Sequence, residues 1–118
     1  MRFLTILALL LTAQLQPAAA DDNTTDVRKL LSWCKSPQGS TDLNVCVGYV
    51  AGVFDLMGMV GASRANNSAF LGACGEKRLT YGATVLVFIN WAERHPELWT
   101  APQVVGVAAA IREQSPCK

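Results

Sequence analysis

Asp55 is the first candidate for chemistry, because it is the one acid inside the apolar stretch CVGYVAGVFDLMG, Cys46 to Gly58. A carboxyl group whose pKa is raised by burial can act as a general acid or base. That role needs a second acid or a free nucleophile, and the sequence offers neither beside Asp55. We therefore predict a structural Asp55 whose carboxylate accepts hydrogen bonds from the N-terminal amides of a neighbouring helix.

The glycines of this stretch favour the same interpretation. Gly48 and Gly52 lie four residues apart on one helical face, and Asp55 follows three residues later. Glycine inside a helix costs about 1 kcal/mol relative to alanine, so a compensating gain is expected, usually the close approach of another helix. The sequence therefore predicts a tight helix contact formed by Gly48, Tyr49, Gly52 and Asp55.

His95, the only histidine, is the remaining candidate base. It precedes Pro96 at an expected helix end, where a cation interacts favourably with the helix dipole. If all cysteines are bridged, no thiol nucleophile remains. The sequence contains no G-x-S-x-G, P-loop, dinucleotide-binding or H-E-x-x-H motif. These features predict a protein that is not an enzyme and that has no catalytic residue, cofactor or metal.

Four cysteines, Cys34, Cys46, Cys74 and Cys117, are separated by 11, 27 and 42 residues. A Cys₄ zinc site normally pairs its ligands through short C-x₂₋₄-C spacings, and none occurs here. An even number of cysteines in a small exported chain indicates disulfides, because the compartment is oxidising. We expect two bridges.

The N-terminus carries the pattern of a secretory signal peptide over residues 1–20. A short basic start precedes the apolar run Phe3 to Leu15 and the small-residue site Ala18–Ala20, which predicts cleavage after Ala20. Residues 21–118 then form one exported domain, with no membrane span expected after cleavage. The formal net charge of +1 for the whole chain offers no basic surface for nucleic acid.

The hydrophobic pattern predicts an all-α fold. Helical segments are expected at Thr25–Cys34, from Asp42 or Leu43 to Gly61, at Thr80–Arg94 and from Thr100 to Ser115. Thr24 or Thr25 can cap the first, whose apolar residues form one helical stripe. The second is apolar on nearly every side and is expected to be buried all round. Short connections make neighbouring helices antiparallel, which gives a small up-and-down four-helix bundle. In that arrangement Cys34 and Cys46 share one end and Cys74 and Cys117 the other, so the expected pairs are Cys34–Cys46 and Cys74–Cys117.

The segment CVGYVAGVFD is similar to the C-x-G-Y-x-x-G-x-x-D signature of the Rap/Tai immunity proteins, which are resistance-associated and type VI amidase immunity proteins. The upstream Cys34, the downstream Cys74, the helix ending in HPE and the terminal SPC extend the resemblance over residues 21–118. It implies a disulfide-bonded, all-α periplasmic protein, often a homodimer. It also implies a partner, because members of the family block peptidoglycan-cleaving amidase toxins.

Two functions from different classes follow. The first is a stoichiometric toxin inhibitor whose loop RHPELWT contacts the partner through Arg94, His95, Glu97 and Trp99, since Arg and Trp are enriched at interface hot spots. In the competing interpretation, Trp99 only packs under the turn. The second function is a periplasmic acid-stress or envelope-stress chaperone that exposes apolar surface in acid. An exported helical domain of unassigned role is the third possibility.

Overall fold

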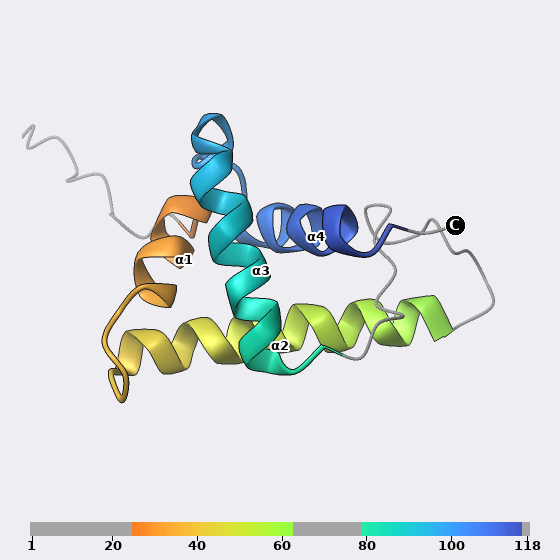
Figure 1. Cartoon of the computed structure of the whole chain (residues 1–118), viewed down its shortest axis with the longest axis horizontal. Helices are drawn as coiled ribbons and strands as arrows, with labels where there is room; N and C mark the ends of the chain where they lie inside the picture. The colour runs from red at the N-terminus through yellow and green to blue at the C-terminus, as the bar shows by residue number, and fades with distance from the viewer. Residues whose placement is uncertain (1–24, 63–78, 117–118) are drawn as a thin grey trace, which may run out of the picture.

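The computed structural model describes residues 25–62 and 79–116, and for residues 60–62 only the backbone (Figure 1). Within these ranges the regular elements are helices, and an isolated β-bridge joins Asp26 to Pro102. The elements are α1 (Val27–Cys34), α2 (Thr41–Ala62), α3 (Tyr81–Arg94), the 3-10 helix η1 (Pro96–Leu98) and α4 (Gln103–Gln114). The predicted all-α class is confirmed.

Helix α1 begins at a cap that differs from the expected one. The Asp26 carboxylate accepts a hydrogen bond from the Lys29 amide at 2.8 Å, so Asp26 is the N-cap rather than Thr24 or Thr25. The expected helical stripe is confirmed, because all four of its members are buried. They are Val27, Leu30, Leu31 and Cys34.

Helix α2 buries one face instead of its whole circumference. Cys46, Val50, Val53 and Met57 follow one another at helical spacing and are buried. The expectation of a helix buried all round is wrong, because Val45, Leu56 and Met59 are 45%, 44% and 72% exposed. A helix that is apolar all round cannot reveal by its pattern which face the other helices cover.

By length and hydropathy alone, Thr41–Met59 of α2 could cross a membrane, the one such helix in the described part of the chain. This corrects the expectation that no segment after residue 20 is long and apolar enough. A helix in the core of a protein passes the same test, and α2 packs against α1, α3 and α4.

The four helices do not form the predicted up-and-down arrangement. Figure 1 shows α3 running across α2 rather than alongside it. The antiparallel expectation depends on short connections between helices, whereas residues 63–80 lie between the end of α2 and the start of α3. A connection of that length lets α3 cross α2 steeply.

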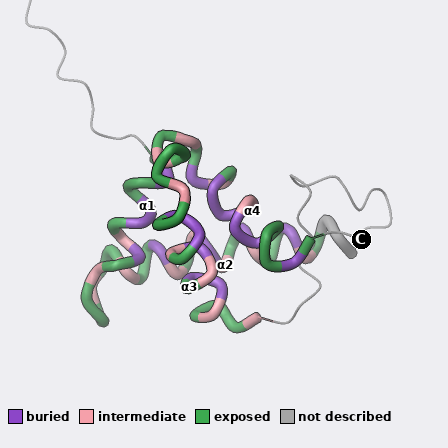
Figure 2. Tube along the Cα trace, turned by 45° about the horizontal axis from the view of Figure 1, so that its top comes forward, coloured by how far each residue is buried: buried purple, intermediate pink, exposed green. Residues whose placement is uncertain are grey.

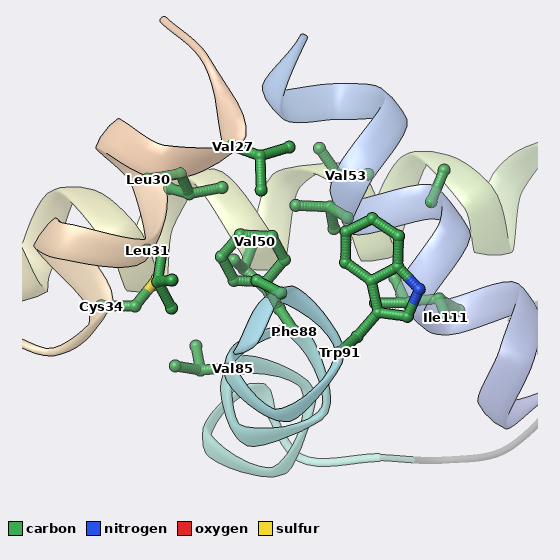
Figure 3. Close-up of a cluster of buried hydrophobic side chains, with 14 of the residues drawn as sticks. Val27, Leu30, Leu31, Cys34, Val50, Val53, Val85, Phe88, Trp91 and Ile111 are labelled. Atoms are coloured by element: carbon green, nitrogen blue, oxygen red, sulfur yellow. The ribbon is translucent and has the colours of Figure 1, made fainter. Parts of the chain in front are cut away.

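One core joins all four helices. Buried positions occur on each of the four helices (Figure 2). Phe88 and Trp91 project from α3 into the space between α1, α2 and α4 (Figure 3), and they are 1% and 4% exposed. Each large aromatic side chain buries about 150 to 250 Å² and therefore contributes strongly to the core. Gly106 of α4 allows close approach here, because an added Cβ would collide with Cγ2 of Val27. The glycine that permits tight packing is therefore Gly106.

The predicted Cys34–Cys46 disulfide is confirmed. It joins the last residue of α1 to the second turn of α2, with the two Cα atoms 5.1 Å apart. The predicted Cys74–Cys117 bridge lies outside the described residues and remains a prediction.

Candidate partner-binding surface

The predicted contact loop is a hydrogen-bonded corner between α3 and α4. His95 leaves the helical region at φ −123° and ψ 58°, as expected for a residue before proline, and Pro96 opens η1. Backbone amides of Leu98 and Ala101 donate to the carbonyls of His95 and Leu98, each at 3.0 Å. Figure 1 shows this corner at the end of α3 that lies away from α2.

Charged side chains of the corner form one connected network with α4. Arg94 Nη2 donates to Glu113 Oε1 at 2.7 Å, and His95 Nε2 lies 3.6 Å from Glu113 Oε2. On its other side His95 Nδ1 lies 2.9 Å from Glu97 Oε1. The hydrogen bond from Arg94 lowers the pKa of Glu113, and the hydrogen bond from His95 lowers the pKa of Glu97.

Trp99 is held by contacts on two sides. Its indole Nε1 donates to the carbonyl oxygen of Ala92 at 2.8 Å, and the guanidinium of Arg28 lies 5.8 Å from the ring centroid. The side chain is half-buried and packs against the core. The structure therefore gives Trp99 the packing role described above, and leaves part of its ring at the surface.

Two neighbouring hollows lie beside the corner. The larger, about 500 Å³, lies between α3 and α4, and the smaller, about 430 Å³, lies between α3, η1 and α4. Trp91 and Glu113 line both of them. Arg94 lines the first and His95 the second, so the corner and these hollows form one continuous surface.

Two residues of this surface, Leu98 and Glu113, were not among those predicted from the sequence. Leu98 is 40% exposed in the middle of the loop, and its apolar type within RHPELWT was a usable signal. Glu113 is 19 residues from Arg94 in the chain. Its position on α4 gave no signal, because the contact depends on how α3 and α4 cross.

The predicted helix contact around Asp55 is not formed by the described residues of this chain. Gly48 and Gly52 are exposed, and no described atom lies within 4 Å of a Cβ added to either. Asp55 is also exposed and accepts from the Tyr81 hydroxyl, at 3.0 Å and 3.3 Å, instead of from backbone amides. Tyr49 is half-buried against the core, and burial raises the pKa of its phenol.

These positions have a simple physical explanation. The buried stripe of α2 runs through Cys46 and Val50, and the two glycines lie on the other side of the helix. The carboxylate of Asp55 still contacts α3, because Tyr81, which donates the hydrogen bond, is the first residue of that helix. The bond raises the pKa of Tyr81, since the neighbouring carboxylate disfavours loss of the phenolic proton.

No group of three or more His, Cys, Asp or Glu side chains is arranged to hold a metal ion among residues 25–62 and 79–116. The described surface instead offers an exposed, hydrogen-bonded corner with both signs of charge and one exposed leucine. Such a surface suits contact with another protein, because interface rims are polar and surround a few apolar anchors.

Comparison with known proteins gives a match to one family. Residues 26–117 match the Rap1a immunity proteins. Neither the curated proteins nor the solved structures contain a match. The matched region begins at Asp26, the N-cap of α1, and includes all four cysteines and the whole corner between α3 and α4. The chain belongs to the Rap1a immunity protein family.

Proposed function

We propose that this protein is a periplasmic immunity protein that binds and inhibits a peptidoglycan-cleaving amidase toxin delivered by type VI secretion. Membership of the Rap1a immunity family supports a role in immunity through a toxin partner. The signal-peptide pattern at residues 1–20 supports action in the periplasm. The proposal of an amidase target rests on the resemblance of CVGYVAGVFD to the signature of the Rap/Tai immunity proteins.

The observation that carries the proposal is the corner formed by Arg94 to Trp99. Its backbone is fixed by its own hydrogen bonds, and a loop ordered in advance loses less entropy on binding. The side chains of Arg94 and Glu97 are 61% and 63% exposed. Leu98, which is 40% exposed, adds an apolar side chain to the same corner, so the corner can enter a cleft and contact it with both charged and apolar groups.

Inhibition of an amidase tests the proposal. The oxidised protein from residue 21 onward is used to capture partners from periplasmic and secreted extracts at pH 7 and near pH 3, and any captured amidase is purified. We expect stoichiometric binding at pH 7 and loss of peptidoglycan hydrolysis. A mixed set of proteins captured only in acid would contradict the inhibitor role and support the acid-stress chaperone.

A matched pair of variants locates the contact. Leu98→Ala removes the apolar side chain of the corner, whereas Leu86→Ala removes an exposed leucine of α3 that is 60% exposed. We expect Leu98→Ala to weaken inhibition by about tenfold, which corresponds to about 1.4 kcal/mol, and Leu86→Ala to leave it unchanged. Equal effects of both substitutions would place the contact elsewhere.

A homodimer is part of the proposal because the family resemblance implies one. The described surface that favours it is the outer face of α2, which leaves Val45, Leu56 and Met59 exposed. Sedimentation equilibrium of the wild type and of Met59→Glu checks this point. Concentration-dependent association that Met59→Glu abolishes is expected, and a monomer at all concentrations would contradict it.

A further inference from the structure

We infer that Glu113 of α4 is a positioning residue for partner binding, because its carboxylate ties Arg94 and His95 of the corner to the last turns of α4. This inference rests on the proposed function, in which the corner contacts the toxin. It adds a residue outside the loop to the determinants of binding. The family match covers Glu113 but gives it no role.

The two carboxylate oxygens of Glu113 meet different residues. Oε1 accepts from Arg94 Nη2 at 2.7 Å, and Oε2 lies 3.6 Å from His95 Nε2. One side chain on α4 therefore contacts both the last residue of α3 and the residue that caps it. These two residues carry the change of direction from α3 into η1.

We call the contacts of Glu113 with Arg94 and His95 the clamp. His95 has further contacts of its own. Nδ1 lies 2.9 Å from Glu97 Oε1, and the ring lies against Trp91 with centroids 4.9 Å apart. The imidazole can donate to Glu97 and Glu113 together only when both of its nitrogens carry protons. Two cations lie near the His95 ring. Arg94 is the preceding residue, at the end of α3, and Arg112 of α4 lines the smaller hollow together with His95.

The expected effect is moderate. Exposed ion pairs contribute little individually, and side-chain exposures of 61% for Arg94 and 46% for Glu113 place this pair in that class. The Arg94–Glu113 contact contributes to binding by ordering the corner in the free protein, which lowers the entropy cost of binding the partner. Loss of the Glu113 charge should therefore weaken partner binding by about fivefold rather than abolish it.

Glu93 provides a matched control. Its side chain is 45% exposed against 46% for Glu113, it pairs with one cation, Lys35, and it lines the same hollow. Lys35 follows α1 and does not belong to the corner. Glu113→Gln and Glu93→Gln thus remove the same charge from the same surface, but only Glu113→Gln releases Arg94 and His95.

Hydrogen exchange of the free protein tests the inference without a partner. The reporters are the amides of Leu98, Trp99 and Ala101, which donate within the corner. Glu113→Gln should lower their protection factors at pH 7, and Glu93→Gln should not. Equal protection in wild type and Glu113→Gln, or equal loss in both variants, would overturn the positioning role.

A pH profile separates positioning from general stability. Because the hydrogen bond from Arg94 lowers the folded-state pKa of Glu113, the Arg94–Glu113 contact is present above the usual Glu range and is lost as pH falls through the lowered value. Wild-type protection at the corner should fall more steeply on acidification than that of Glu113→Gln, in which the Glu97–His95 contact still responds to acid. A similar fall in both proteins would contradict the inference.

Binding to the captured amidase completes the experiment. Glu113→Gln should raise Kd about fivefold and Glu93→Gln should leave it unchanged. If the exchange effect is seen but the wild type neither binds nor inhibits an amidase, the proposed function fails and the ordering of the corner stands. If the amidase binds the wild type and Glu113→Gln with equal Kd, Glu113 is not a positioning residue for this partner.

Discussion

Alanine at Gly106 and alanine at Gly52 should change the stability of this protein in opposite directions. Both glycines lie inside helices, Gly106 in α4 and Gly52 in α2. A Cβ at position 106 would overlap Cγ2 of Val27 and lie 3.4 Å from Trp91 Cζ3 and 3.5 Å from Phe88 Cε2. A Cβ at position 52 meets no described atom within 4 Å.

The magnitudes follow from two opposing effects. Replacing glycine by alanine within a helix contributes about 1 kcal/mol of stability in both variants. At Gly106 overpacking costs about 1 to 3 kcal/mol, because Val27 is fully buried and its β-branched side chain moves with difficulty. Gly106→Ala should thus lose up to about 2 kcal/mol, and Gly52→Ala should gain about 1 kcal/mol.

Thermal and urea unfolding of the oxidised protein, followed by far-UV circular dichroism, measures both effects. For a domain of this size 1 kcal/mol corresponds to about 4 to 8 °C in Tm. The two variants should therefore differ in Tm by at least several degrees. If Gly106→Ala is as stable as Gly52→Ala, the close approach of α4 to Val27 is refuted. A destabilised Gly52→Ala would show that another chain segment or a second copy covers the outer face of α2.

Further changes test the disulfide and the two hydrogen-bonded acidic groups. Replacing Cys34 and Cys46 by serine together should cost about 3 kcal/mol in urea unfolding, since the bridge closes a loop with a sequence separation of 12; unchanged stability would show that the bridge does not restrict the unfolded chain. Asp55→Asn should bring the pKa of Tyr81 down toward the usual 10.0, seen by tyrosinate absorbance, because Asp55 is what raises it. Since that folded-state pKa is raised, the bond stabilises the fold below pH 10.0 and is lost as pH rises through the raised value; an unshifted titration in Asp55→Asn would argue against the bond. Glu97→Gln should reduce the loss of stability in acid, because the pKa of Glu97 is lowered in the folded state and its contribution disappears as pH falls through that value; identical acid unfolding of wild type and variant would contradict this.

Local patterns in the sequence predicted the features that depend on local structure. The stripe of α1 repeats at helical spacing, and only 11 residues lie between Cys34 and Cys46, so one turn between two helices is enough to bring them together. The break at His95 follows from Pro96, whose ring restricts the residue before it. For these elements, sequence neighbours supply most of the information.

Features that depend on the crossing of distant helices were not predictable in the same way. Helix α2 is apolar on nearly every side, so its pattern could not show that Gly48 and Gly52 lie opposite the core. Tyr81 is 26 residues from Asp55, and Glu113 is 19 residues from Arg94. Which side chains meet over such separations depends on how the helices pack. Only that packing reveals Gly106 as the glycine at a close contact and Glu113 as part of the corner.

The start of α1 imposes an order on folding. The amides of Val27 and Arg28 donate to the carbonyls of Ala101 and Trp99, and Gln103 donates to Thr25. These partners emerge from the ribosome roughly 70 residues after α1, on the order of 4 to 14 s later at ordinary synthesis rates. Helix α1 therefore cannot complete its backbone hydrogen bonds until residues 99–103 have been made. These contacts between distant parts of the chain delay closure of the core until α4 begins to form.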